Sequence, residues 1–244
     1  ELTHLTVVSD FRSRDVAAGG EGAPLVPVFH AAVFGTPDEH RVVVNIGGIA
    51  NLTDLPPAGP VTGFDCGPGN LLLDGWVQKN RGTSFDRDGE WARSGRIIST
   101  LFKRLAADEY FRLRPPKSTG RETFNMQWVT GHLNGSENPA DVQATLLELT
   151  ARGIADAILK FSSDAKSIYL CGGGARNVAL VQRLSELLAP RNVDATDRLG
   201  VDAEHVEALA FAWLAQQTLE GKTGNLPSVT GARGLRILGA IHPA

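Results

Sequence analysis

Two glycine-rich turns are the segments of this chain best suited to bind a phosphate. The first covers residues 45–51 (Asn-Ile-Gly-Gly-Ile-Ala-Asn) and the second residues 171–177 (Cys-Gly-Gly-Gly-Ala-Arg-Asn). Glycine permits a positive φ, and successive backbone N–H groups in such a turn bind anions. The second turn lies between an expected strand and an expected helix, and the backbone N–H groups at the N-terminus of a helix favour phosphate binding. An ordinary hairpin turn is the alternative for the first, and the second lacks the G-x-G-x-x-G spacing.

A carboxylate lies between these turns in the sequence. Asp65 ends an expected strand and is followed by the loop Cys-Gly-Pro-Gly at residues 66–69. Catalytic carboxylates are common at strand ends next to flexible backbone. Asp65 is therefore a candidate general base for an oxygen nucleophile. A structural aspartate that caps the loop is the alternative.

Three groups of charged residues are candidates to bind an anionic or polar substrate. Arg12 and Arg14 follow the first expected strand and have the geometry to pair with an anion. Residues 117–121 (Lys-Ser-Thr-Gly-Arg) form a second candidate anion loop. Glu207 lies in an apolar helical stretch, where a buried carboxylate needs a partner or a ligand. A solvent-exposed surface position is the alternative for all of them.

The composition excludes several classes of protein. The 244 residues, 42% hydrophobic and 21% charged, are typical of one large or two small folded domains. A net charge of −3 without a basic stripe argues against nucleic-acid binding. No apolar run reaches the ~18 residues of a membrane helix, and no secretory leader is visible. The two cysteines, Cys66 and Cys171, are far apart, so we expect a cytoplasmic protein without a disulfide or a zinc site.

Hydrophobic patterning predicts the elements that position these residues. The expected strands are residues 5–9, 41–46, 49–55, 60–65, 167–170 and 192–195. The expected helices are residues 24–34, 71–80, 94–107, 141–161, 177–188 and 201–219. Residues 41–55 are predicted to form a hairpin about Gly47-Gly48, and Asn70 is predicted to cap the helix that follows it. Strands that alternate with helices predict an α/β fold with a mixed sheet.

Six short segments, each a weak signal alone, are together highly specific for one family because they occur in that family's order. They are residues 8–27 (VSDFRSRDVAAGGEGAPLVP), 45–53 (NIGGIANLT), 63–70 (GFDCGPGN), 115–125 (PPKSTGRETFN), 171–177 (CGGGARN) and 207–215 (EALAFAWLA). Together they resemble the anhydro-N-acetylmuramic acid kinases. The resemblance implies an actin-like ATPase or ribonuclease H-like fold whose two lobes close over ATP. In that scheme residues 1–40 are the remainder of the N-terminal lobe with a connecting helix, and residues 41–244 are the C-terminal lobe, including a helix that returns to connect the lobes.

The resemblance also implies the reaction. An enzyme of this family uses ATP, Mg²⁺ and water to open the anhydro bridge of 1,6-anhydro-N-acetylmuramic acid and to phosphorylate O6. The product is N-acetylmuramic acid 6-phosphate, in cytoplasmic cell-wall recycling, and a homodimer is implied for the full-length form. Asp65 corresponds to the catalytic base, and no residue is implied as a metal ligand. The implied nucleotide-binding residues are Asn45, Gly47, Gly48, Asn51, Gly172, Gly173, Gly174 and Asn177, and the implied substrate-binding residues are Arg12, Arg14, Gly67 and Glu207.

The chain departs from the family pattern in two ways. Cys66 stands where a threonine is expected. The family's first phosphate loop, Gly-Thr-Ser-x-Asp-Gly-x-Asp, has no counterpart in the chain. We therefore expect the chain to be the C-terminal two-thirds of a kinase, with an incomplete first lobe, an unpaired strand edge at residues 5–9 and no activity of its own. The alternatives are another actin-like phosphotransferase or ATPase, and a non-catalytic fragment that binds sugar or a partner.

Overall fold

A five-stranded mixed sheet forms the centre of the structure, a computed structural model that describes residues 4–244. Its strand order is β4-β3-β2-β5-β6. The strands are β2 (Arg41–Ile46), β3 (Ile49–Leu55), β4 (Thr62–Pro68), β5 (Ser167–Cys171) and β6 (Asn192–Ala195). β3 is antiparallel to β2 and to β4, whereas β5 is parallel to β2 and β6 is parallel to β5. The predicted α/β class is confirmed, as is the hairpin at residues 41–55.

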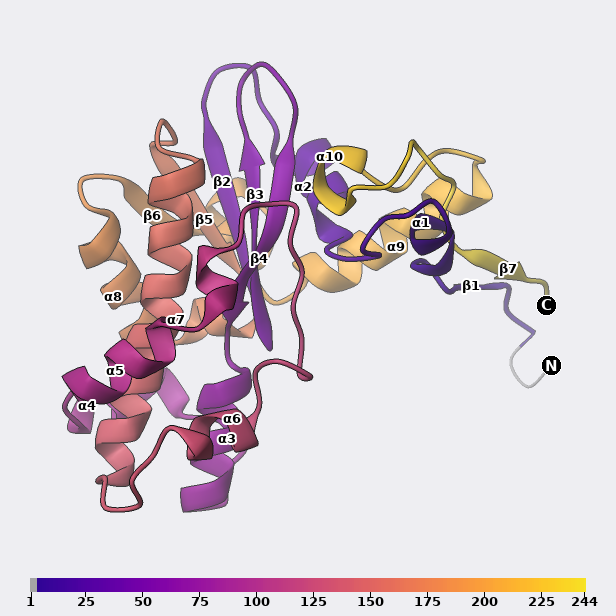
Figure 1. Cartoon of the computed structure of the whole chain (residues 1–244). Coiled ribbons are helices and arrows are strands. Elements are labelled where there is room, and N and C mark those ends of the chain that lie inside the picture. Colours follow the sequence, from indigo (N-terminus) through magenta and orange to yellow (C-terminus); the bar gives the residue numbers. More distant parts are fainter. Residues whose placement is uncertain (1–3) are drawn as a thin grey trace.

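Helices cover both faces of this sheet, as Figure 1 shows. The long helix α7 (Pro139–Phe161) packs on one face together with α3 (Leu71–Arg81), α5 (Ser99–Ala106) and α8 (Val178–Leu188). The other face is covered by α2 (Val26–Phe34) and α9 (Val206–Leu219). Because side chains alternate along a strand, Val42 and Val44 enter the first core and Val43 the second. The sheet is thus buried on both faces.

A second, two-stranded sheet joins the two ends of the described chain. β1 (Val7–Ser9) pairs antiparallel with β7 (Ala240–His242), and Figure 1 shows the pair beside both termini. β1 therefore has β7 on one edge and pairs with no other strand among the residues described, so one of its edges is unpaired, as predicted. Asp15, fully buried, accepts hydrogen bonds from Asn225 and Thr230, which also join the two ends. The division at residue 40 remains a prediction.

The remaining helical elements are short. The remaining α-helices are α1 (Ser13–Ala17), α4 (Glu90–Ser94), α6 (Met126–Gly131) and α10 (Pro227–Thr230). Single 3₁₀ turns occupy Arg87–Gly89, Glu109–Arg112, Gly173–Arg176 and Thr196–Leu199. No helix among the residues described is both long and apolar enough to cross a membrane.

Two predicted helices begin five residues later than the sequence pattern indicated. The segment predicted as one helix over 94–107 is broken at Gly95, where a Cβ atom would lie 2.1 Å from the Ala140 carbonyl oxygen, and α5 begins only at Ser99. The segment predicted over 201–219 begins as turns, and α9 starts at Val206. Gly200, at φ 85°, ends the 3₁₀ turn just before it. The close approach of the distant residue Ala140 to Gly95 thus accounts for the late start of α5.

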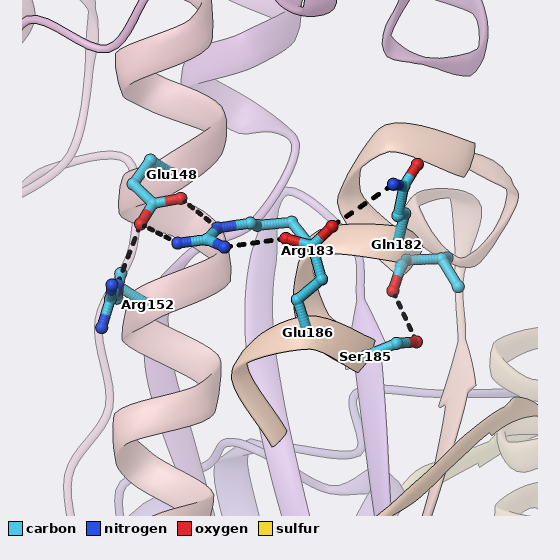
Figure 2. Close-up of polar contacts among 7 residues, drawn as sticks. Glu148, Arg152, Gln182, Arg183, Ser185 and Glu186 are labelled. Atoms are coloured by element: carbon cyan, nitrogen blue, oxygen red, sulfur yellow. Dashed lines mark hydrogen bonds and ion pairs between the residues drawn. The ribbon is translucent and has the colours of Figure 1, made fainter. Parts of the chain in front are cut away.

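A part-buried ion pair joins α8 to α7 (Figure 2). Glu148 on α7 accepts hydrogen bonds from Nε and Nη2 of Arg183 on α8, over 2.7 and 2.9 Å, and a third from Arg152. Burial opposes ionisation of Glu148, but the hydrogen bonds from Arg183 and Arg152 lower its pKa overall. The bidentate geometry makes this contact stronger than a surface ion pair.

Candidate active site

A cavity of about 660 Å³ opens on the α2 and α9 side of the sheet. Strand and hairpin residues form its floor, the loop over residues 118–122 forms one wall, and α9 contributes Glu207 and Phe211. Arg12 and Glu21, from the N-terminal segment, also line it. Segments that are far apart in the sequence therefore meet around one space.

Three polar side chains lie side by side on the cavity floor. Asn45 on β2 is the register partner of Asn51 on β3, which is the register partner of Asp65 on β4. Directly opposed residues project to the same face of a sheet. All three line the cavity and are more than nine-tenths buried, with exposed fractions of 5%, 8% and 5%. The sheet register, rather than proximity in sequence, produces this row.

β4 is irregular at Asp65. The strand was predicted to end at residue 65, but it continues to Pro68. Asn51 pairs with Asp65 while Ala50 pairs with Gly67, so Cys66 is an extra residue in a β-bulge. The Cys66 side chain enters the α7 core, away from the cavity floor. The departure from threonine at this position therefore lies on the opposite face from Asp65.

Hydrogen bonds hold one oxygen of the Asp65 carboxylate. Oδ2 accepts a hydrogen bond from Ser118 Oγ and another from the Thr119 N–H, each over 3.0 Å. The Tyr110 hydroxyl donates to the Asp65 carbonyl over 2.7 Å, and the Asp65 N–H donates to the Lys117 carbonyl over 3.3 Å. Oδ1 has no hydrogen-bond partner among residues 4–244. The carboxylate is thus fixed through one oxygen and free through the other.

Burial makes Asp65 a stronger base than an exposed aspartate. Removal from water raises the pKa of its carboxyl group above the usual range. The Thr119 N–H and the Ser118 hydroxyl counteract part of this increase, as do the positive charges of Arg12 and Lys117. A raised pKa on a carboxylate at a cavity wall is typical of a general base.

The first glycine turn borders the same cavity. The Gly47 carbonyl accepts a hydrogen bond from the Asn70 N–H, and the Gly48 carbonyl accepts from Gly69 and Leu71. Neither glycine has the positive φ that the sequence pattern allowed for. A Cβ atom would meet nothing closer than 3.6 Å at Gly47 and 3.9 Å at Gly48. Neither the backbone conformation nor the packing requires glycine at positions 47 and 48. The absence of a side chain there leaves space beside the cavity.

The second glycine turn borders a neighbouring cavity of about 420 Å³. Of its three glycines, Gly173 lines that space. Gly172 has φ 78° and would clash with Asn45 and Ile46 if it carried a Cβ, and Gly174 would clash with the Ile46 side chain. Gly172 and Gly174 thus let the turn pack against the end of β2.

Asn70 links the two turns. It is the N-cap residue of α3, as predicted, but its side chain makes no capping hydrogen bond. Its Nδ2 instead donates to the Ile46 carbonyl over 3.1 Å. Asn70 lines the second cavity and Leu71 the first, so the two spaces adjoin at these consecutive residues.

The other predicted site residues are divided between these spaces and the surrounding structure. Asn177 lines the second cavity, and its side chain caps α8 by accepting a hydrogen bond from the Leu180 N–H. Arg14 donates to the Ile237 carbonyl over 3.2 Å and is not among the residues that line the first cavity. Gly67 has φ 142° and faces the Phe111 ring, on the other side of β4. Arg12 and Glu207 line the first cavity together with Asp65.

Sequence reasoning missed the acidic lining of the second cavity and the contact of Ser118 with Asp65. That lining includes Asp74, Asp86, Asp88 and Glu204, and burial raises the pKa of Asp74 to about 6. Residues 117–121 were predicted as an anion loop, but Ser118 binds Asp65. No sequence signal pairs these residues. Within residues 4–244 no group of three or more His, Cys, Asp or Glu side chains is arranged to hold a metal ion.

Two solved structures share a low similarity with this chain. The activator of the 2-hydroxyisocaproyl-CoA dehydratase from Clostridium difficile with bound ADPNP is 16% identical, with a TM-score of 0.45 over 79% of this chain and 67% of that one. The ethanolamine utilization protein EutJ from Carboxydothermus hydrogenoformans is 17% identical, with a TM-score of 0.39 over 73% and 51%.

Sequence relatives are much more similar. The family model for anhydro-N-acetylmuramic acid kinase matches residues 1–244. Proteins of that name from Nitrosospira multiformis and Nitrosomonas europaea are 60% and 55% identical over the whole chain. One from Thiobacillus denitrificans is 55% identical over the whole chain and 66% of its own length. The chain spans 67% of the length of the first two relatives. It belongs to the anhydro-N-acetylmuramic acid kinase family.

Proposed function

We propose that this chain carries the catalytic base of an ATP-dependent kinase that opens 1,6-anhydro-N-acetylmuramic acid and phosphorylates its O6. The observation that carries the proposal is the state of Asp65. It is buried on a cavity floor, its pKa is raised, and only one of its oxygens is engaged. Such a group can accept a proton from water while its position stays fixed.

The reaction follows from that proton transfer. Oδ1 of Asp65 takes a proton from a water molecule, and the water oxygen bonds to C1 of the anhydrosugar. The C1–O6 bond breaks, and its electron pair stays on O6. O6 then bonds to the γ-phosphorus of ATP, and ADP leaves. The products are N-acetylmuramic acid 6-phosphate, ADP and the proton held by Asp65.

The two glycine turns would hold the nucleotide. Gly47 and Gly48 leave room for phosphate groups in the first cavity, and Gly173 leaves room for the nucleoside in the second. One nucleotide can occupy both spaces because they adjoin at Asn70 and Leu71. Mg²⁺ would supply charge neutralisation at the phosphates. Since residues 4–244 hold no cluster of three metal-binding groups, the phosphates and water would provide most of its ligands.

The chemical groups of the substrate suggest binding roles for two further cavity residues. N-acetylmuramic sugars carry a lactyl carboxylate, and Arg12, which lines the cavity, can bind it in a bidentate manner. Glu207 can accept hydrogen bonds from sugar hydroxyl or amide groups. The cytoplasmic location, the place in cell-wall recycling and the homodimer of the full-length form belong to this proposal.

Replacement of Asp65 by asparagine tests the proposal. The assay uses a full-length form, in which residues 1–244 are joined to the N-terminal third of the Nitrosospira multiformis relative. Asp65→Asn should lower single-turnover phosphorylation of the anhydrosugar by about 10²–10⁴-fold and leave ATP affinity within about twofold. Asp54→Asn is the matched control, because Asp54 is also buried on a central strand but pairs with His40 outside the cavity. Single-turnover rates of Asp65→Asn within about threefold of the unaltered enzyme would contradict the assignment.

A further inference from the structure

Lys117 is a buried lysine that has no carboxylate partner in the described part of the chain. Its side chain is 8% exposed and lines a small cavity of about 100 Å³ between β4, α5 and α7. Nζ donates a hydrogen bond to the Tyr110 carbonyl over 3.2 Å, and no ion pair joins it to an acidic side chain within residues 4–244. Lysine is rarely buried without such a partner, because its charge is costly to remove from water.

Aromatic rings surround the charge of Lys117 instead. Nζ lies 4.3 Å from the centre of the Tyr110 ring and 5.7 Å from the centre of the Phe64 ring. The face of an aromatic ring attracts a cation, and the attraction is larger where water is excluded. Burial lowers the pKa of Lys117, as does the charge of Lys160, whereas the charge of Asp65 raises it. The rings and the Tyr110 carbonyl therefore fix the amine at one place behind β4.

Consecutive residues of the loop after this point lie on opposite faces of β4. Ser118 lines the first cavity and donates to Oδ2 of Asp65. Lys117 lines the small cavity together with Cys66, whose side chain enters the α7 core. The main chain joins the two faces, because the Asp65 N–H donates to the Lys117 carbonyl over 3.3 Å. Lys117 thus anchors the loop where it meets the strand that carries the proposed base.

Tyr110 connects the same lysine to the other side of the Asp65 backbone. Its hydroxyl group donates to the Asp65 carbonyl over 2.7 Å, and its own carbonyl accepts from Lys117 Nζ. The N–H of Asp65 is therefore bonded to Lys117 and the carbonyl of Asp65 to Tyr110. Both contacts depend on a lysine whose side chain lies away from the first cavity.

We infer that Lys117 is a positioning residue for Asp65, which holds residues 118–119 against its carboxylate and places a positive charge behind it. The inference rests on the proposed function. Lys117 is not among the residues that line the first cavity, so it acts through Asp65 and not on the substrates. Its charge favours the ionised form of Asp65. Small displacements of a catalytic group lower the rate strongly, which gives an anchor of this kind a measurable effect.

Other charged groups face the two residues. The charged residues that line the first cavity with Asp65 are Arg12, Glu21, Arg121, Glu122 and Glu207. Those that line the small cavity with Lys117 are Arg152, Asp156 and Lys160, all on α7. The charges of Arg12 and Lys117 lower the pKa of Asp65. Lys160 therefore provides a matched control, because it brings a positive charge to the same small cavity without a contact to the loop.

The experiment measures the pH profile of single-turnover phosphorylation for the full-length form and three variants, with KM for ATP and Tm. Lys117→Met keeps an unbranched side chain but removes the charge and the donor. It should move the acidic limb to higher pH, lower the plateau rate about tenfold or more, and leave KM for ATP within about twofold. Lys117→Arg keeps the charge and should keep the limb. Lys160→Met should keep both the limb and the plateau rate within about twofold.

The position of the limb does not depend on how much enzyme is folded, so it separates positioning from stability. A lower Tm of Lys117→Met with an unmoved limb would show a merely structural lysine and overturn the inference. A limb that moves as far in Lys160→Met or in Lys117→Arg would overturn it too, as would a raised KM for ATP at an unchanged plateau rate. The kinase proposal survives these results. Inactivity of the unaltered full-length form, or full activity of Asp65→Asn, would overturn both.

Discussion

The hydroxyl group of Ser118 donates a hydrogen bond to Oδ2 of Asp65 over 3.0 Å, across 53 residues of sequence. The Thr119 N–H donates to the same oxygen. This arrangement stabilises the ionised carboxylate and engages Oδ2, while Oδ1 accepts no hydrogen bond within the described part of the chain. A loop that the sequence suggested for anion binding thus orients the proposed base.

Removal of the Ser118 hydroxyl should change the pH dependence of turnover. The hydrogen bond from Ser118 lowers the pKa of Asp65 against the effect of burial, so Ser118→Ala should raise that pKa further. A general base acts when deprotonated, and the acidic limb of kcat/KM should therefore move to higher pH. The measurement is a pH profile of the full-length form. Ser118→Thr, which retains a hydroxyl, should restore the original limb, and a limb that stays in place in Ser118→Ala would contradict this role.

Asp65→Asn should stabilise the protein at neutral pH. The folded-state pKa of Asp65 lies above its ordinary value because burial disfavours the charge. Below the unfolded-state pKa, Asp65 is neutral in both states and its burial does not lower the free energy of unfolding. As pH rises through the folded-state pKa, the buried group ionises and that free energy falls. An amide carries no charge to desolvate, and Tm should rise by about 2–4 °C at pH 7, with a smaller difference near pH 4. Thermal unfolding at both pH values checks this, and a lower Tm at pH 7 would contradict it.

A bulky residue at Gly173 should interfere with nucleotide binding. Gly173 lines the second cavity, and the nearest atom to a Cβ there would be Asn70 Nδ2 at 3.7 Å. Gly173→Val should weaken ATP binding about tenfold or more, with Tm changed by about 2 °C at most. Gly172→Ala is the contrasting variant, because its positive φ and close approach to Ile46 should lower Tm. Calorimetric titration and thermal unfolding separate the two effects. Unweakened ATP binding in Gly173→Val would exclude this turn from the nucleotide site.

Loss of Arg12 should affect the sugar more than the nucleotide. Arg12 lines the cavity and its charge reaches Asp65, whereas Arg14 bonds to the Ile237 carbonyl. In the full-length form, Arg12→Ala should raise KM for the anhydrosugar about tenfold or more and KM for ATP about twofold at most. Arg14→Ala should raise the sugar KM less. An anhydrosugar without the lactyl group provides a second check, since Arg12→Ala should not weaken its use. Equal changes in both KM values would indicate a structural arginine.

Residues 1–244 alone should be inactive. Phosphoryl transfer requires charge stabilisation around the γ-phosphate, and the resemblance assigns part of it to a first phosphate loop that this chain does not contain. The chain also exposes apolar side chains near the β1–β7 pair and on α9, including Val7, Leu209, Phe211 and Ile241. We expect less than about a tenth of the turnover of the full-length form in an ATP-consumption assay, and self-association in sedimentation. Turnover within tenfold of the full-length form would show that the first loop is dispensable.

Local sequence by itself determined the hairpin, the long helix and the glycine turns. The runs Arg41–Ile46 and Ile49–Leu55 match β2 and β3 because buried β-branched residues on both sides of Gly47-Gly48 are a local signal. The helical spacing of apolar residues likewise placed α7 within two residues of its start. Six ordered motifs carried the family resemblance, which the matches to known proteins confirm.

Tertiary structure alone decided what the candidate residues touch. The row of Asn45, Asn51 and Asp65 exists because of the register of three strands, and the bulge at Cys66 depends on the partner strand. The side chain of Asn70, the N-cap residue of α3, bonds to the Ile46 carbonyl and not to its own helix, because the end of β2 lies beside it. The β1–β7 pair joins the two ends of the described chain. Hydrophobic periodicity reports which face of an element is buried, but hydrogen-bond partners across tens or hundreds of residues depend on how whole elements pack.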